Sequence, residues 1–165
     1  MTNEDRQIKR DRFRYTKNSL SSGLALIAIL FNVFYFVSIY KSDAGNYYYK
    51  YMIGVSILYN LVFMLVVFLC SEGVKKYNLS YAVTLVIVGL LQIARIFILP
   101  TDAHSATVVV SGAETAVMGD GQFTRVIVYL TVSAAFCIAA GLIGIIRNRM
   151  LAAYTKELTG EAAKA

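Results

Sequence analysis

The chain has 165 residues, of which 58% are hydrophobic and only 16% are charged, and its mean hydropathy is +0.59. This balance argues against an ordinary soluble domain and indicates an integral membrane protein. The formal net charge is +6 at pH 7. Nearly all of the basic residues lie outside the long apolar stretches. The net positive charge is therefore located in the terminal segments and in the connections between the stretches.

Four apolar stretches each reach the roughly 20 residues that a helix needs to cross a hydrocarbon core of about 30 Å. They cover residues 20–40, 51–70, 79–99 and 126–146. The connections 41–50 and 71–78 are so short that they force antiparallel neighbours. The predicted fold is an all-α membrane protein, an up-down bundle of four transmembrane helices.

Basic residues are unevenly distributed among the connections, and short cytoplasmic connections carry most Lys and Arg. We therefore expect a basic cytoplasmic N-terminal segment at 1–19, a transmembrane domain at 20–146 and a cytoplasmic tail at 147–165. Both termini are predicted to be cytoplasmic, and the protein is predicted to lie in the cell membrane. Anionic head groups of the inner leaflet are the expected partners of Arg10, Arg12, Arg14, Lys17, Lys75, Lys76, Arg147 and Arg149.

The sequence contains few residues or motifs that indicate catalysis, metal binding or nucleic-acid binding. The basic segment lacks a nucleic-acid-binding motif, so no nucleic-acid partner is expected. Cys70 and Cys137 form no Cys-x-x-Cys pair, and facing helices would hold them about 14 Å apart in depth, too far for a disulfide. His104 is the only histidine and has no second metal ligand at helical spacing. No metal, cofactor or catalytic residue is predicted, and the protein is not expected to be an enzyme.

Four polar side chains lie near the midpoints of the first three predicted spans. They are Asn32, Ser56, Asn60 and Gln92. In hydrocarbon such groups face other helices, where each hydrogen bond contributes roughly 0.6 to 2 kcal/mol. The layer therefore either fixes the pairing of the helices or lines a passage for a small polar solute.

Arg95 is the only charged side chain inside the four stretches. It lies in the outer half of the third span, one helical turn beyond Gln92, and its side chain is expected to face protein or water. The nearest acids within the chain are Asp43 and Asp102. The missing counter-charge is supplied by an outer connection, water, a solute or another subunit, and we expect another subunit.

The fourth span carries small residues at intervals of about four. Ser133, Cys137 and Gly141 form one such series, and Ala140 and Gly144 form another. Small residues at this spacing let two helix backbones approach closely. The surface is suited to tight packing, either inside this chain or against a partner.

The outer connection 100–124 is the longest, and its valine run 108–110 is followed by two glycine-containing turns. It forms either a short hairpin, which covers the outer end of the bundle or contacts an extracytoplasmic partner, or a mobile linker. In the tail, the sequence from Leu151 predicts a short helix that stops near Gly160.

Three stretches, SIYKSDAGNYYYKYMIGVSILYN, FLCSEGVKKYNLSYA and RIFILP, resemble uncharacterised small four-helix membrane proteins of Gram-positive bacteria. Some of those proteins are linked with sugar-type ABC importers. The resemblance covers residues 10–100 and carries over no site residue. It implies an accessory function in a bacterial cytoplasmic membrane.

The sequence thus favours a non-catalytic accessory or structural subunit of a larger membrane complex, such as a solute transporter. This subunit is expected to contact another integral membrane subunit or a second copy of itself. The alternative is an autonomous small-solute transporter or channel that uses the polar layer around Asn32, Asn60, Gln92 and Arg95. Small multidrug exporters also have four helices but use a glutamate within the membrane. The four apolar stretches contain no acid, which argues against proton-coupled cation export.

Overall fold

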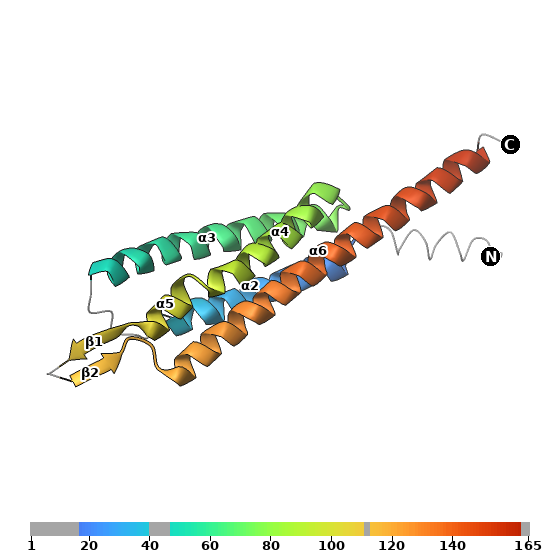
Figure 1. The fold of residues 1–165 in the computed structure, drawn as a ribbon. Coiled ribbons are helices and arrows are strands. Elements are labelled where there is room, and N and C mark those ends of the chain that lie inside the picture. Colours follow the sequence, from blue (N-terminus) through green and yellow to red (C-terminus); the bar gives the residue numbers. More distant parts are fainter. Residues whose placement is uncertain (1–16, 40–46, 111–112, 163–165) are drawn as a thin grey trace.

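A computed structural model describes residues 17–39, 47–110 and 113–162 of the chain. Its long helices are α2 (Ser19–Ile39), α3 (Tyr47–Lys75), α4 (Leu79–Ile96) and α6 (Asp120–Ala162). Between α4 and α6 lie the short helix α5 (Leu99–Ser105) and the strands β1 (Thr107–Val110) and β2 (Ala113–Ala116). Figure 1 shows the long helices side by side in an elongated bundle, with the strands at one end, here called the hairpin end.

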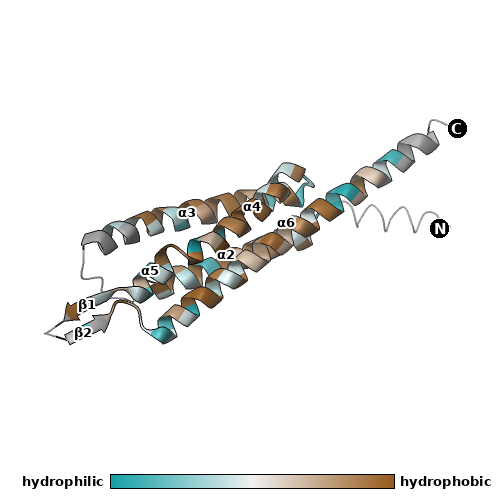
Figure 2. Ribbon diagram, viewed as in Figure 1, coloured by the Kyte–Doolittle hydropathy of each residue, from teal (hydrophilic) through white to brown (hydrophobic). Residues whose placement is uncertain are grey.

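All four long helices are long and apolar enough to cross a membrane. Their candidate spans are Ser19–Ile39, Gly54–Lys75, Leu79–Ser105 and Asp120–Lys156. Figure 2 shows that hydrophobic residues predominate along the bundle, whereas the C-terminal part of α6 beyond it is more hydrophilic. The four helices predicted from the apolar stretches are confirmed, and this architecture suggests a multi-pass membrane protein.

The third predicted span, 79–99, is interrupted before its end. α4 stops at Ile96, and the backbone turns for two residues before α5 begins. Pro100 explains the break, because it has no N–H to donate and its ring would clash with the carbonyl four residues earlier in a continuous helix. That carbonyl belongs to Ile96, and it accepts a hydrogen bond from Thr101 Oγ1 at 2.8 Å instead.

The segment 100–124, predicted as an outer connection, has regular structure over most of its length. α5, the antiparallel pair of β1 and β2, and the start of α6 occupy it. Of the two alternatives for the valine run 108–110, the structure has the hairpin. The base of the hairpin is closed by a hydrogen bond from Val117 N to Ala106 O at 3.0 Å.

α6 is longer than the fourth predicted span, 126–146, in both directions. It begins at Asp120 and continues without interruption to Ala162, so the prediction of a separate short helix from Leu151 is wrong. The tail consists largely of strong helix formers, and extending an existing helix costs less than starting a new one. A helix of 43 residues is about 65 Å long, roughly twice the thickness of a hydrocarbon core.

Two clusters of buried apolar side chains form the core. One lies among the four long helices and contains Ala25, Ala28, Phe63, Val67, Cys70, Val74, Ala82, Leu85, Cys137 and Ala140. The other lies near the hairpin end and contains Tyr35, Ile39, Leu99, Ala103, Met118, Val126 and Leu130. α6 packs extensively against α4 and α2, whereas α3 packs mainly against α2 and less closely against α4. This unequal packing leaves a seam between α3 and α4.

The turn between α3 and α4 closes the end of the bundle opposite the hairpin. Tyr77 has a φ of 59°, a left-handed conformation that favours glycine. The end of α3 is held by hydrogen bonds from Tyr77 N to Val74 O at 3.0 Å and from Asn78 N to Gly73 O at 3.2 Å. Asn78 then caps α4, since its Oδ1 accepts from Ser80 N at 3.2 Å. The turn therefore fixes where α4 starts relative to α3.

Candidate functional site

Three helices each contribute two side chains, one helical turn apart, to a buried layer. Side chains three or four residues apart share one face of a helix, so both members of each pair meet the same neighbours. We call this group the polar layer; it consists of Asn32 and Tyr35 from α2, Ser56 and Asn60 from α3, and Gln92 and Arg95 from α4. All six are buried, and the three amide side chains are fully buried.

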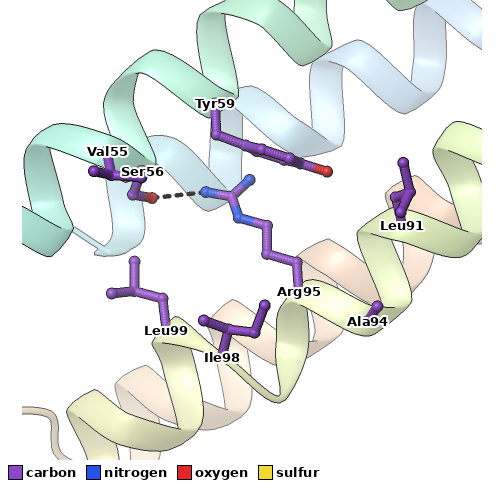
Figure 3. A pocket seen from close by; sticks show the side chains of 8 residues that line it. All are labelled: Val55, Ser56, Tyr59, Leu91, Ala94, Arg95, Ile98 and Leu99. Carbon is purple, nitrogen blue, oxygen red and sulfur yellow. Dashed lines mark hydrogen bonds between the residues drawn. The ribbon is translucent and has the colours of Figure 1, made fainter.

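Arg95 reaches from α4 to α3, where it donates two short hydrogen bonds. Nη1 donates to Asn60 Oδ1 and Nη2 donates to Ser56 Oγ, both at 2.7 Å. The guanidinium carbon lies 4.6 Å from the centroid of the Tyr35 ring and 4.4 Å from that of the Tyr59 ring. Figure 3 shows the Arg95 side chain extending from α4 toward Ser56, with the Tyr59 ring beside it. Arg95 therefore joins α4 to both α3 and α2.

These contacts offset the cost of a charge in an apolar bundle. Hydrogen bonds from a charged donor are about twice as strong as neutral ones, and a desolvated cation–π contact contributes about 2 kcal/mol. The opposing cost of an arginine at the centre of a membrane helix is about 2.5 to 3.5 kcal/mol on insertion scales. Of the acids considered from the sequence, Asp102 is exposed on α5 and Asp43 lies outside the described residues. A carboxylate from another subunit stays a prediction.

Gln92 and Asn32 join α4 to α2. Gln92 Nε2 donates to Asn32 Oδ1 at 2.7 Å. Asn32 Nδ2, Asn60 Nδ2 and Gln92 Oε1 have no hydrogen-bond partner among the described residues. A buried polar group without a partner costs about 1 to 3 kcal/mol. If the polar layer opened, these atoms would form hydrogen bonds with water or with the polar part of a ligand.

The seam between α3 and α4 holds two adjoining cavities, of about 240 Å³ and about 190 Å³. The larger is lined by Val55, Ser56, Tyr59, Leu91, Ala94, Arg95, Ile98 and Leu99 (Figure 3). The smaller is lined by Tyr59, Val62, Phe63, Val66, Val88 and Leu91. Because Tyr59 and Leu91 line both cavities, we treat them as one feature and call it the α3–α4 groove.

The small residues of α6 face the other helices of the same chain. Ser133 Oγ donates to Ala28 O at 2.8 Å, and Ala140 O accepts a hydrogen bond from Ser21 Oγ. Both acceptors are backbone carbonyls, so these contacts require the backbones of α2 and α6 to approach closely. Cys137 is fully buried in the same core.

Gly141 and Gly144 bring α6 close to α4, and Gly144 also faces α3. A Cβ on Gly141 would lie 2.7 Å from Ala82 O, and one on Gly144 would lie 3.1 Å from Val74 Cγ1. Only glycine allows helices to pack at this distance without displacement. Of the two alternatives for the small-residue face of the fourth span, the structure therefore has packing inside this chain.

Most of the described basic residues near the ends of the spans lie opposite the hairpin, whereas Lys50 and Arg125 lie near the hairpin end. Lys75 pairs with Glu72 at 3.0 Å, and Arg147 Nη1 donates to Asn18 Oδ1 at 3.1 Å. Exposed residues of this group are Lys17, Lys76 and Arg149. Three further residues predicted to contact head groups, Arg10, Arg12 and Arg14, lie outside the described residues. A layer of anionic head groups at this end would match the arrangement.

Other reactive groups are dispersed. Cys70 and Cys137 are buried free thiols. The His104 ring stacks on Phe123 with centroids 4.1 Å apart, and its Nε2 lies 3.7 Å from the Asp120 carboxylate. In the part of the chain that the structure describes, no three His, Cys, Asp or Glu residues could hold a metal ion together. The chemistry that the polar layer offers is hydrogen bonding and positive charge.

Tyr35 and Tyr59 contact Arg95, but neither was singled out from the sequence as a candidate site residue. Tyr35 follows Asn32 by three residues, and Tyr59 follows Ser56 by three residues. An aromatic ring one turn from a polar residue shares its helix face. This spacing is the signal that would have indicated aromatic partners for the arginine.

Comparison of the chain with models of protein families, with curated proteins and with solved structures found no match. The resemblance to membrane proteins of Gram-positive bacteria therefore stays a prediction.

Proposed function

We propose that this protein is a non-catalytic integral membrane subunit with an accessory or structural role in a larger membrane complex. The observation that carries the proposal is that polar groups inside the bundle bind one another, Arg95 to Asn60 and Ser56, and Gln92 to Asn32. Groups used in this way hold helices in a fixed arrangement. These contacts favour a structural role of the polar layer over a role in lining a passage for a solute.

The C-terminal part of α6 supports the same proposal because it leaves the bundle. Asn148 Nδ2 donates to Tyr77 O in the turn between α3 and α4, and the helix continues to Ala162. The remaining 14 residues, here called the α6 extension (149–162), add about 21 Å of helix. Figure 1 shows this part reaching beyond the other helices. Such a helix offers a partner a surface outside the apolar layer.

Co-purification in mild detergent tests whether the α6 extension binds a partner protein. The full chain should retain a membrane protein in stoichiometric amount, whereas a chain that ends at Asn148 should lose it, because the docking helix is absent. The unfolding midpoint of the shortened chain should be unchanged, since the described core contacts precede the extension. A chain in which the order of residues 149–162 is reversed keeps length and composition and should also lose the partner.

If the full chain instead purifies alone and moves a solute in liposomes, the accessory role is wrong. One observation favours that second candidate, an autonomous small-solute transporter. Three amide atoms of the polar layer, Asn32 Nδ2, Asn60 Nδ2 and Gln92 Oε1, lack a partner among the described residues. A solute could bind them if the layer opened. The liposome measurement therefore decides between the two functions.

We also propose that the protein lies in the cytoplasmic membrane with both termini in the cytoplasm, on the basis of the basic residues opposite the hairpin. The sugar-type ABC importers implied by the resemblance are the candidate complex. This assignment of the complex rests on the resemblance alone.

Thiol labelling of intact cells tests the orientation. Glu114 is exposed on β2 and Arg149 is exposed beyond the opposite end of the bundle. A cysteine that replaces Glu114 should react with a membrane-impermeant maleimide, whereas one that replaces Arg149 should react only after permeabilisation. The native thiols Cys70 and Cys137 are buried and should contribute little signal. The reverse labelling pattern would show that the termini face outward.

A further inference from the structure

The α3–α4 groove is elongated along the helix axis and open on its side. Its lining on α3 extends from Val55 to Val66, a distance of about 16 Å along the helix. Large apolar side chains on both walls are about half exposed, with values of 48% for Val55, 54% for Leu91 and 55% for Ile98. In a membrane these walls face hydrocarbon, so the groove opens toward lipid.

The groove is polar at only one of its two ends. Ser56 and Arg95 line the cavity near the hairpin end, and the cavity farther from it is lined by apolar and aromatic side chains. Arg95 lies one residue before the end of α4 at Ile96. A lipid in the leaflet at the hairpin end has the same polarity, with its head group toward that surface and its chains toward the middle of the bilayer.

The guanidinium at this end also contacts a buried amide, that of Asn60, which does not itself line either cavity. Asn60 is fully buried, and its Nδ2 has no hydrogen-bond partner in the described parts of the chain, although its Oδ1 accepts from Arg95. A guanidinium and an amide N–H are both donors, and the guanidinium fork matches the geometry of phosphate and carboxylate groups. This end of the groove therefore favours a ligand group that is anionic and accepts hydrogen bonds.

We propose that the α3–α4 groove binds one membrane lipid, whose acidic head group lies near Ser56 and Arg95 and one of whose acyl chains lies along the seam. The two cavities, about 240 Å³ and 190 Å³, are too small to enclose a helix, which is about 10 Å wide with its side chains. They suit a single flexible chain. The lipid site does not depend on the accessory role and would exist in a protein that works alone.

The test measures thermal unfolding of the full chain in mild detergent with added phosphatidylglycerol or phosphatidylcholine of identical acyl chains. At about 100 times its Kd, phosphatidylglycerol should raise the unfolding midpoint by roughly 5 to 10 °C. Phosphatidylcholine should raise it much less, because its head group carries no net charge. Native mass spectrometry of the same sample should detect one retained phosphatidylglycerol.

A matched pair of variants locates the bound lipid. Leu91 lines both cavities, whereas Leu90 lines neither, and the two side chains are 54% and 55% exposed. Leu91→Trp should fill the groove and abolish the shift, whereas Leu90→Trp should keep it. This comparison is needed because the basic residues at the opposite end also attract acidic lipids. Val62→Trp, which fills the other end of the groove, replaces Leu91→Trp if that variant does not fold.

Three results would overturn the lipid site. Equal shifts of the unfolding midpoint with the two lipids would show that the acidic head group does not contribute to binding. An undiminished shift in both groove-filling variants would place the lipid elsewhere on the protein. A partner protein that dissociates from Leu91→Trp but not from Leu90→Trp would identify the groove as a contact for a helix rather than for a lipid.

Discussion

Replacing Gly141 by valine is expected to destabilise the protein by about 3 kcal/mol. A Cβ at this position would lie 2.6 Å from Val86 Cγ2, 2.7 Å from Ala82 O and 3.0 Å from Val86 N. Two of these neighbours are backbone atoms, so a change of rotamer cannot remove the overlap. α4 and α6 would have to separate, and their packing is the most extensive in the bundle.

The free energy of unfolding in detergent micelles measures this effect. Gly23→Val is the matched control, because a Cβ at Gly23 on α2 has no atom within 4 Å. The control should change the free energy of unfolding by less than about 0.5 kcal/mol, as for a surface substitution. Equal losses in the two variants would mean that the close approach of α6 to α4 does not determine stability.

Arg95→Leu is expected to lower the free energy of unfolding by about 2 kcal/mol. The substitution removes two hydrogen bonds of 2.7 Å and the contacts with two tyrosine rings. It also leaves Ser56 and Asn60 with fewer partners in an apolar surrounding, at a cost of about 1 to 3 kcal/mol for each group left unsatisfied. Relief from burying a charge opposes these losses, which is why the expected effect is smaller than their sum.

Arg95→Lys and Arg125→Leu serve as comparisons in the same assay. Lysine keeps the charge but cannot reproduce the planar fork that reaches two acceptors at once, so Arg95→Lys should be intermediate. Arg125 is exposed, and its Nε donates to Gly121 O within its own helix, so its loss should have little effect. A stability of Arg95→Leu equal to that of the unsubstituted protein would mean that Arg95 does not hold α3 against α4.

The fold could be predicted from the sequence because each helix satisfies its own backbone and needs only sufficient apolar length. The break before Pro100 was not predicted, because the third predicted span is continuous over 79–99, whereas α4 ends at Ile96. The length of α6 was predicted wrongly because the fourth predicted span ends at Ile146 and the residues from Leu151 were predicted to form a separate short helix, whereas α6 continues through Gly160 to Ala162. A single glycine costs about 1 kcal/mol in a helix, which does not end a helix that already extends from Asp120.

The polar layer could be predicted as a set of residues but not as a set of contacts. Asn60 lies 15 residues before the end of α3 at Lys75, and Arg95 lies 16 residues after the start of α4 at Leu79. In antiparallel neighbours joined by a short turn, these counts place the two at the same depth. Depth alone does not give the rotation of each helix. That rotation depends on the packing of α2 and α6, and it decides that Arg95 meets neutral acceptors and rings.

A double-mutant cycle between Arg95 and Asn60 measures most directly the interaction that holds α4 against α3. The variants are Arg95→Leu, Asn60→Leu and the double substitution, each compared by its free energy of unfolding in micelles. A coupling of about 1 to 2 kcal/mol is expected, because the bond from Nη1 to Oδ1 at 2.7 Å is lost only once in the double variant. A coupling indistinguishable from zero would contradict the conclusion that the polar layer stabilises the bundle.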